Sequence, residues 1–205
     1  MLAIKYGASA LGLVSEMPSG PGVIDDELIK EIISKVPPPI ATFLLTSKQN
    51  ADEIISQHFK TRTNTLQLVD HLPQSELIKL KEKLPEIKLV QVIHVLGEHS
   101  IDEAISVQNF VDALLLDSGN PNLDVKELGG TGRTHNWEIS RKIINAVKIP
   151  VFLAGGLNPK NVREAMETVQ PYGLDICSGV RSNGNLDEMK LNLFFKEVNL
   201  YNNNI

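Results

Sequence analysis

The sequence predicts an α/β fold of the TIM (βα)8-barrel type, with seven βα units visible and the first strand missing. Short apolar runs alternate with segments that carry apolar residues at helical spacing, from one end of the chain to the other. Most of the strand-like runs are continuously apolar, which is typical of parallel strands covered on both faces. A flavodoxin-like open sheet is the alternative, but so many consecutive units favour the barrel.

The first third of the chain already shows this alternation. Residues Met1–Tyr6 resemble the last turns of a helix that ends at Gly7, and Ala10–Val14 is the first apolar run. The segment Asp25–Lys35 is predicted to be helical and to stop before Pro37, because its apolar residues recur at intervals of three and four: Leu28, Ile29, Ile32 and Ile33.

The later units repeat the same order. The remaining strands are predicted at Ala41–Leu45, Thr65–Val69, Leu89–Val95, Ala113–Asp117, Pro150–Ala154 and Leu174–Cys177. The remaining helices are predicted at Asn50–Phe59, Ser75–Leu84, Ser100–Val107, Trp137–Val147, Asn161–Val169 and Leu186–Val198. A closed eight-stranded barrel needs one more strand, whose place is before Met1. Either the first strand is lacking, or the true start lies upstream.

Several residues have the character of helix caps. We expect Ser47 or Asn50 to cap the helix Asn50–Phe59, and the segment Ser100-Ile-Asp-Glu103 resembles a capping box. Asn158 is expected to be an N-cap that is followed by Pro159 as the first helical residue.

Composition limits the classes of protein that the chain can represent. With 205 residues it is long enough for one domain with a full core, which we assign to residues 1–205. The net charge of −5 argues against nucleic acid or an anionic membrane as the main partner. Cys177 is the only cysteine, so no internal disulfide forms and a cytoplasmic location is expected. No apolar run is long enough to span a membrane.

Glycine-rich turns follow the last two predicted strands. Gly155 and Gly156 come after one strand, and Ser178 and Gly179 come after the next. Glycine lets the backbone approach a ligand closely, and open backbone N–H groups suit an anion. In a parallel barrel these two loops are a frequent phosphate site. The alternative is that the glycines only make tight turns, but their occurrence in two successive units favours phosphate as the ligand.

Four segments carry a resemblance to a known family. The segments LLLDS, GGTGRTHNW, PVFLAGGLNPKNVREAM and PYGLDICSGV, in this order and spacing, resemble phosphoribosylanthranilate isomerase of tryptophan biosynthesis. The resemblance is densest over Ala113–Val180 and extends weakly back to Gly7. It implies an Amadori rearrangement of N-(5-phosphoribosyl)anthranilate to the carboxyphenylamino-deoxyribulose phosphate. That reaction needs a general acid, a general base and a grip on phosphate and anthranilate, but no metal or cofactor.

The resemblance also implies roles for individual residues. Asp117 ends a strand at the rim where barrels place catalysis, and it resembles the family's general acid. Burial among apolar neighbours would raise its pKa, although an aspartate here could simply cap a turn. Asp175 matches a carboxylate near the substrate, or is a buried strand residue. The phosphate-binding residues implied are Gly130, Gly132, Arg133, Gly155, Gly156, Ser178 and Gly179, with the segment Gly129–Thr134 as a substrate-closing loop.

The sequence also departs from the family. The family's base is a cysteine in a Lys-Ile-Cys-Gly motif that this chain does not contain, and Cys177 aligns with a family serine. The family's Ser-Pro-Arg segment corresponds here to Gly20-Pro21-Gly22. The remaining departures are Val69 for a histidine, Gln91 for a lysine and Arg181 for a glutamate.

Three functional classes therefore stay open. The first is the isomerase, and the second is a catalytically impaired or diverged paralogue that binds a sugar phosphate. The third is another phosphate-binding barrel enzyme, such as an epimerase, for which His94 and Asp117 are too few metal ligands. The uncovered edges of the first and last strands suggest a homodimer.

Overall fold

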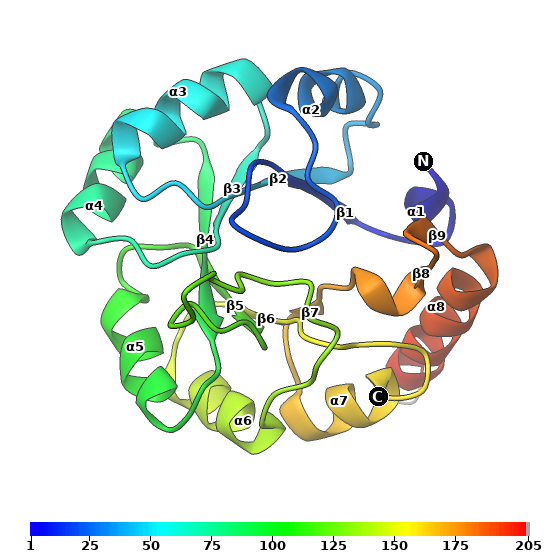
Figure 1. Cartoon of the computed structure of the whole chain (residues 1–205). Helices are drawn as coiled ribbons and strands as arrows, with labels where there is room; N and C mark the ends of the chain where they lie inside the picture. The colour runs from blue at the N-terminus through cyan, green and yellow to red at the C-terminus, as the bar shows by residue number, and fades with distance from the viewer. Residues whose placement is uncertain (204–205) are drawn as a thin grey trace.

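Seven strands form one parallel sheet whose order follows the chain (Figure 1). The computed structural model describes residues 1–203. Each strand pairs in parallel with the next one, which confirms the predicted chain of βα units. The strands are β1 (Ala10–Val14), β2 (Ala41–Thr46), β3 (Thr65–Leu68), β4 (Lys88–His94), β5 (Ala113–Asp117), β6 (Val151–Leu153) and β7 (Gly173–Leu174).

The helices form a ring around the sheet in Figure 1. They are α1 (Leu2–Lys5), α2 (Asp26–Ile33), α3 (Ala51–Thr61), α4 (Gln74–Lys83), α5 (His99–Val107), α6 (Trp137–Ala146), α7 (Val162–Val169) and α8 (Glu188–Asn202). The predicted positions are confirmed to within a few residues at each end. Among residues 1–203, no helix combines the length and the apolarity needed to cross a membrane.

Two separate apolar clusters fill the space on either side of the sheet. Along β5, Leu114 and Leu116 belong to the large cluster beneath the helices. Leu115 belongs to a smaller cluster inside the barrel, together with Val92 and Ala154. Because successive side chains of a strand point to opposite faces, Asp117 lies on the inner face like Leu115. The period of β5 therefore directs this carboxyl group into the barrel.

The caps of the helices were only partly predicted. Asn50 caps α3, accepting hydrogen bonds from the backbone N–H groups of Asp52 and Glu53. The predicted capping box at Ser100 is wrong, because α5 begins at His99 and the Ser100 hydroxyl donates to the His94 carbonyl oxygen instead. A tertiary hydrogen bond has replaced the local one.

The predicted start of α7 is also wrong. Asn158 and Pro159 precede the helix, which begins at Val162. The side chains of two asparagines accept backbone hydrogen bonds within this turn. The Asn158 N–H donates to Asn161 Oδ1 over 2.8 Å, and the Lys160 N–H donates to Asn158 Oδ1 over 2.9 Å. This arrangement shapes the loop after β6.

The end of the sheet differs most from the prediction. The strand expected at Leu174–Cys177 is reduced to Gly173–Leu174, and a 3₁₀ turn follows at Ser178–Val180. Next comes an unpredicted hairpin of β8 (Arg181–Ser182) and β9 (Asn185–Leu186). Its two turn residues have positive φ angles, 50° at Asn183 and 81° at Gly184, as a two-residue hairpin turn requires.

The sheet is open between β7 and β1, which do not pair within the part of the chain that the structure describes. Near the end of β1, the Ile24 N–H donates to the Val14 carbonyl oxygen over 2.9 Å, so the β1–α2 loop folds back onto the free edge. Helix α1 lies on the same side of the molecule as α8 (Figure 1). The side chains of Lys5 and Tyr6 both donate hydrogen bonds to the Glu188 carboxylate at the start of α8.

Candidate active site

A cavity of about 430 Å³ lies at the carboxyl ends of the strands. It is bordered by the loops that follow β1, β5, β6 and β7. Most of the predicted site residues line it, namely Asp117, Gly130, Gly132, Gly155, Gly156, Asp175 and Ser178. Residues from well-separated parts of the sequence are therefore brought together, because the carboxyl ends of parallel strands lie at the same edge of the sheet.

Asp117 is buried at the base of this cavity, with 6% of its surface exposed. Burial raises the pKa of its carboxyl group above the ordinary value, since the charged form loses hydration. The backbone N–H groups of Ser118 and Gly119 and the nearby His94 oppose this shift without reversing it. The raised pKa favours the protonated carboxyl group, which a general acid requires.

Asp175 lies just beyond the end of β7 on the wall of the same cavity. Its backbone N–H donates to the Leu153 carbonyl oxygen over 2.8 Å, which continues the pairing with β6 by one residue. Burial, and secondly the charge of Asp117, raise the pKa of the Asp175 carboxyl group to about 6. Two carboxyl groups with raised pKa values in one cavity are typical of a site that transfers protons.

Three glycine-bearing loops meet beside these carboxyl groups. A β-carbon on Gly179 would overlap the Leu157 carbonyl oxygen, so the turn after β7 packs directly on the loop after β6. A β-carbon on Gly156 would lie 2.6 Å from the Arg133 carbonyl carbon, and one on Gly132 would lie 3.7 Å from Ser178 Oγ. The absence of side chains at these positions lets the three backbones approach one another.

The loop after β6 is held in one conformation by its asparagines. Gly155 and Gly156 have φ angles of 80° and 62°, which few other residues adopt readily. The Gly156 carbonyl oxygen accepts hydrogen bonds from the side-chain amides of Asn158 and Asn161, both over 3.1 Å. The backbone of this loop is therefore fixed by the protein's own hydrogen bonds.

Two predicted binding residues do not line the cavity. The Arg133 guanidinium forms an ion pair with Glu127, and the Arg133 side chain is more than half exposed, so only its backbone approaches Gly156. Gly179 packs against Leu157 behind the cavity wall. In the structure both residues take part in the packing of the loops.

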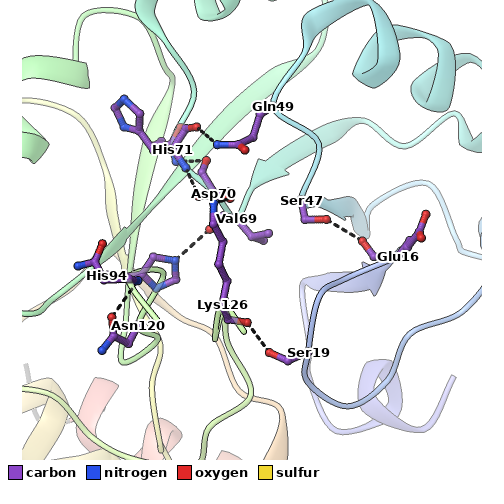
Figure 2. Close-up of polar contacts among 12 residues, drawn as sticks. Glu16, Ser19, Ser47, Gln49, Val69, Asp70, His71, His94, Asn120 and Lys126 are labelled. Carbon is purple, nitrogen blue, oxygen red and sulfur yellow. Dashed lines mark hydrogen bonds and ion pairs between the residues drawn. The ribbon is translucent and has the colours of Figure 1, made fainter. Parts of the chain in front are cut away.

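A hydrogen-bonded network, which the sequence did not indicate, links loops at the cavity rim (Figure 2). Lys126, in the long β5–α6 loop, forms an ion pair with Asp70, which follows β3 and is largely buried. The Lys126 carbonyl oxygen accepts from Ser19 Oγ over 2.6 Å, which adds the β1–α2 loop. The neighbouring Val69 carbonyl oxygen contacts His94 Nε2 over 3.0 Å. Lys126 thus connects three loops around the cavity.

Two further residues near the cavity were not assigned from the sequence. Arg181 lines the cavity. The only indication of this in the sequence is that Arg181 directly follows the predicted phosphate loop, at a position where the family carries a glutamate. His135 lies behind Gly155 and bonds Ser140 Oγ through Nε2 over 2.8 Å. Burial lowers the pKa of His135 to about 4, so it is neutral at physiological pH. Within residues 1–203, no cluster of His, Cys, Asp and Glu has the arrangement of a metal site.

Comparison with known families agrees with this geometry. Residues 2–197 match the family model of N-(5'-phosphoribosyl)anthranilate (PRA) isomerase. The chain belongs to the PRA isomerase family. Its function is accordingly phosphoribosylanthranilate isomerisation in tryptophan biosynthesis.

Curated relatives cover nearly the whole chain. The PRA isomerase 2 of Methanosarcina mazei is 38% identical over 210 residues, which span 98% of this chain and 92% of the relative. The PRA isomerase of Methanocella arvoryzae is 35% identical over 185 residues, which span 90% of this chain and 84% of the relative.

Solved structures of PRA isomerases share the fold. That from Thermotoga maritima superposes with a TM-score of 0.81 at 26% identity, covering 97% of this chain and 91% of the other. A PRA isomerase in complex with reduced 1-(o-carboxyphenylamino)-1-deoxyribulose 5-phosphate has a TM-score of 0.79 at 24% identity, with the same coverage of 97% and 91%. At that identity the second comparison demonstrates the fold alone.

Proposed function

We propose that the cavity at the carboxyl ends of β5, β6 and β7 isomerises N-(5'-phosphoribosyl)anthranilate by proton transfer, with Asp117 as the general acid. The observation that carries this proposal is a buried carboxyl group of raised pKa that faces a cavity bordered by three glycine-bearing loops. The protonated Asp117 would give its proton to the ribose ring oxygen as the ring opens. A general base then takes the proton from C2 of the ring-opened iminium ion, and the resulting enolamine tautomerises to the aminodeoxyribulose phosphate.

The phosphate of this substrate is proposed to bind among the glycine-bearing loops. Gly155, Gly156 and Ser178 line the cavity, as do Gly130 and Gly132 of the β5–α6 loop, and their backbone N–H groups are the proposed phosphate ligands. Backbone N–H groups bind phosphate without any side-chain cation, as nest-like loops do. Asp175 is proposed to contact the sugar. Gly179 and Arg133 are proposed to act only through the packing that holds these loops together.

The open side of the sheet supports a further part of the proposal. Both β1 and β7 have unpaired edges in the described residues, and the seven paired strands are one fewer than an eight-stranded barrel has. We propose that this open side is the position of the first strand and the cysteine base that the sequence lacks. A cytoplasmic location and a homodimer are proposed as well; the dimer finds support in a structure described as monomers made from the dimeric isomerase of T. maritima.

A second candidate function is a paralogue that binds a sugar phosphate without converting it. It is favoured because no described residue that lines the cavity replaces the family's cysteine base. Cys177 is the one cysteine among these lining residues, and it aligns with a family serine. In that case the phosphate loops and Asp117 would persist as a binding site.

An isomerase assay separates the two functions. The loss of phosphoribosylanthranilate fluorescence is followed with the 205-residue chain and with Asp117→Asn. We expect Asp117→Asn to lower whatever turnover the unaltered chain shows by about 10²–10⁴-fold, because the amide cannot donate the acid's proton. A loss below about tenfold would argue against Asp117 as the acid. No turnover, with tight binding of a product analogue, would support the paralogue instead.

A further inference from the structure

We propose that Arg181 binds an oxyanion of the substrate and thereby sets the specificity of the cavity for anionic ligands. This inference rests on the proposed function, because the substrate in question carries both a phosphate and a carboxylate. Arg181 lies at the start of β8, on the side of the cavity formed by the chain after β7.

The charge of the cavity wall is the first argument. Among the described residues that line the cavity, Arg181 is the only cationic side chain, whereas two carboxyl groups, Asp117 and Asp175, face the same space. An anionic substrate would be repelled by any ionised carboxylate there. A fixed positive charge offsets that repulsion, and it acts strongly where the surroundings exclude water.

Other cations near the cavity already have partners. Arg133 pairs with Glu127, and Lys126 pairs with Asp70. The Lys190 ammonium group donates to the Arg181 carbonyl oxygen over 2.6 Å. Arg181 itself forms no ion pair in the described chain, so its charge remains uncompensated until a ligand enters.

The hairpin fixes the position of Arg181. Its Nη1 donates to the Gly184 carbonyl oxygen over 2.8 Å, and its backbone pairs with Leu186 across the hairpin. Ser182 Oγ donates to Asp187 over 2.6 Å, which ties the hairpin to the start of α8. One hydrogen bond to a neutral carbonyl oxygen therefore holds the guanidinium group and leaves its charge unpaired.

One donor of the guanidinium group is left unused. Arg181 Nε is buried and has no hydrogen-bond partner among the described residues. Buried donors are nearly always satisfied, so an unpaired one at a cavity wall indicates that a partner is missing. The planar edge of a guanidinium group presents paired N–H donors that match two oxygens of a carboxylate or a phosphate. An oxyanion would satisfy Nε and neutralise the charge together.

Substitution of Arg181 tests the inference. We expect Arg181→Gln to raise the KM for phosphoribosylanthranilate roughly ten- to hundredfold while kcat changes less than about threefold, because the lost contact holds the substrate and does not move a proton. Arg181→Lys should recover part of the affinity, since it restores a charge without the bidentate geometry. Arg163→Gln is the matched control: this exposed arginine on α7 pairs with Glu167 and should leave KM unchanged.

Two probes identify which group is bound and keep the test independent of turnover. Binding of inorganic phosphate and of anthranilate to the full chain is measured by calorimetry, with and without Arg181→Gln. The probe that contacts Arg181 should bind at least about tenfold more weakly to the variant, while the other is unaffected. If the unaltered chain shows no turnover, the isomerase function fails, but weaker binding of either probe to the variant would still support Arg181 as an anion site. Unchanged KM and unchanged binding of both probes, in a folded variant, would overturn the inference.

Discussion

At the scale of single residues, the cavity combines two carboxyl groups that water would normally keep ionised. Asp117 is set against apolar neighbours by the alternation of β5, and Asp175 follows the short β7. Their mutual repulsion adds to the effect of burial. Folding therefore places both carboxyl groups where their ionised forms are unfavourable, and this lowers the stability of the folded protein.

This cost gives a pH-dependent prediction for Asp175. The pKa of its carboxyl group rises from 3.8 to about 6 on folding, so the folded state retains a proton that the unfolded state has lost between these values. Stability should therefore fall as the pH rises from about 4 to about 6. We expect Asp175→Asn to be more stable than the unaltered chain at pH 7, by on the order of 1–3 kcal/mol, and no more stable near pH 4.

Denaturant unfolding at the two pH values measures this difference. The exposed Asp124 supplies a matched control, because Asp124→Asn should alter stability at neither pH. An equal gain of Asp175→Asn at both pH values would show that the benefit does not come from titration of this carboxyl group.

At the scale of elements, the long β5–α6 loop is fastened by Lys126. This residue contacts Asp70 through its ammonium group and Ser19 through its carbonyl oxygen (Figure 2). The same loop carries Gly130 and Gly132 to the cavity. The fastening of one end of the loop therefore restricts the position of the glycines that border the phosphate site.

Removal of this fastening should loosen the loop. We expect Lys126→Met to cost about 1–3 kcal/mol, since it leaves the buried Asp70 carboxylate without its partner, and to raise KM by roughly three- to tenfold. Hydrogen exchange of residues 118–136 should become faster. Lys142→Met, which breaks an exposed pair with Glu98, is the control and should have little effect. Unchanged exchange in residues 118–136 would mean that the loop is held by its other contacts.

The sequence indicated some elements of the site and not others, for physical reasons. The apolar runs located the strands, and the common direction of parallel strands brings their carboxyl ends together, so the sequence alone was enough to group Asp117, Gly155 and Ser178. The sequence does carry a signal for the β8–β9 hairpin, because Asn-Gly, here Asn183-Gly184, is a strong hairpin turn. No local pattern indicates the observed contact of Ser100, because its hydroxyl donates to the carbonyl oxygen of His94 on another element.

The side-chain partners of the arginines were beyond sequence reasoning as well. Arg133 and Arg181 both lie close to phosphate-loop motifs, and each could have been a ligand-binding residue. The fold pairs Arg133 with Glu127 and leaves Arg181 unpaired at the cavity. Such a difference depends on which loop packs where, which local spacing does not encode.

At the scale of the whole molecule, the strands differ in how far they are buried. Every residue of β3 and β5 is buried, whereas β7 has two residues, both partly exposed, and β1 has exposed residues at its start. Backbone hydrogen bonds open most easily where few contacts cover them.

We expect hydrogen exchange of the native protein to follow this order. Amides of β3, β4 and β5 should be protected nearly to the level of global unfolding, and those of β1, β7 and the β8–β9 hairpin should exchange through local opening. Mass spectrometry of exchanged peptides measures the gradient. Equal protection of β7 and β5 would contradict it and would mean that the open side of the sheet is as stable as the centre.

The contact between Ile24 and Val14 has a consequence for the behaviour of the protein at high concentration. A free sheet edge is a template on which another chain can add a strand, and this is how soluble proteins begin to form fibrils. Here the β1–α2 loop occupies the end of the β1 edge, and the opposite edge, β7, is only two residues long. With the end of β1 covered and β7 only two residues long, the open side of the sheet offers a neighbouring chain only short stretches of backbone to extend.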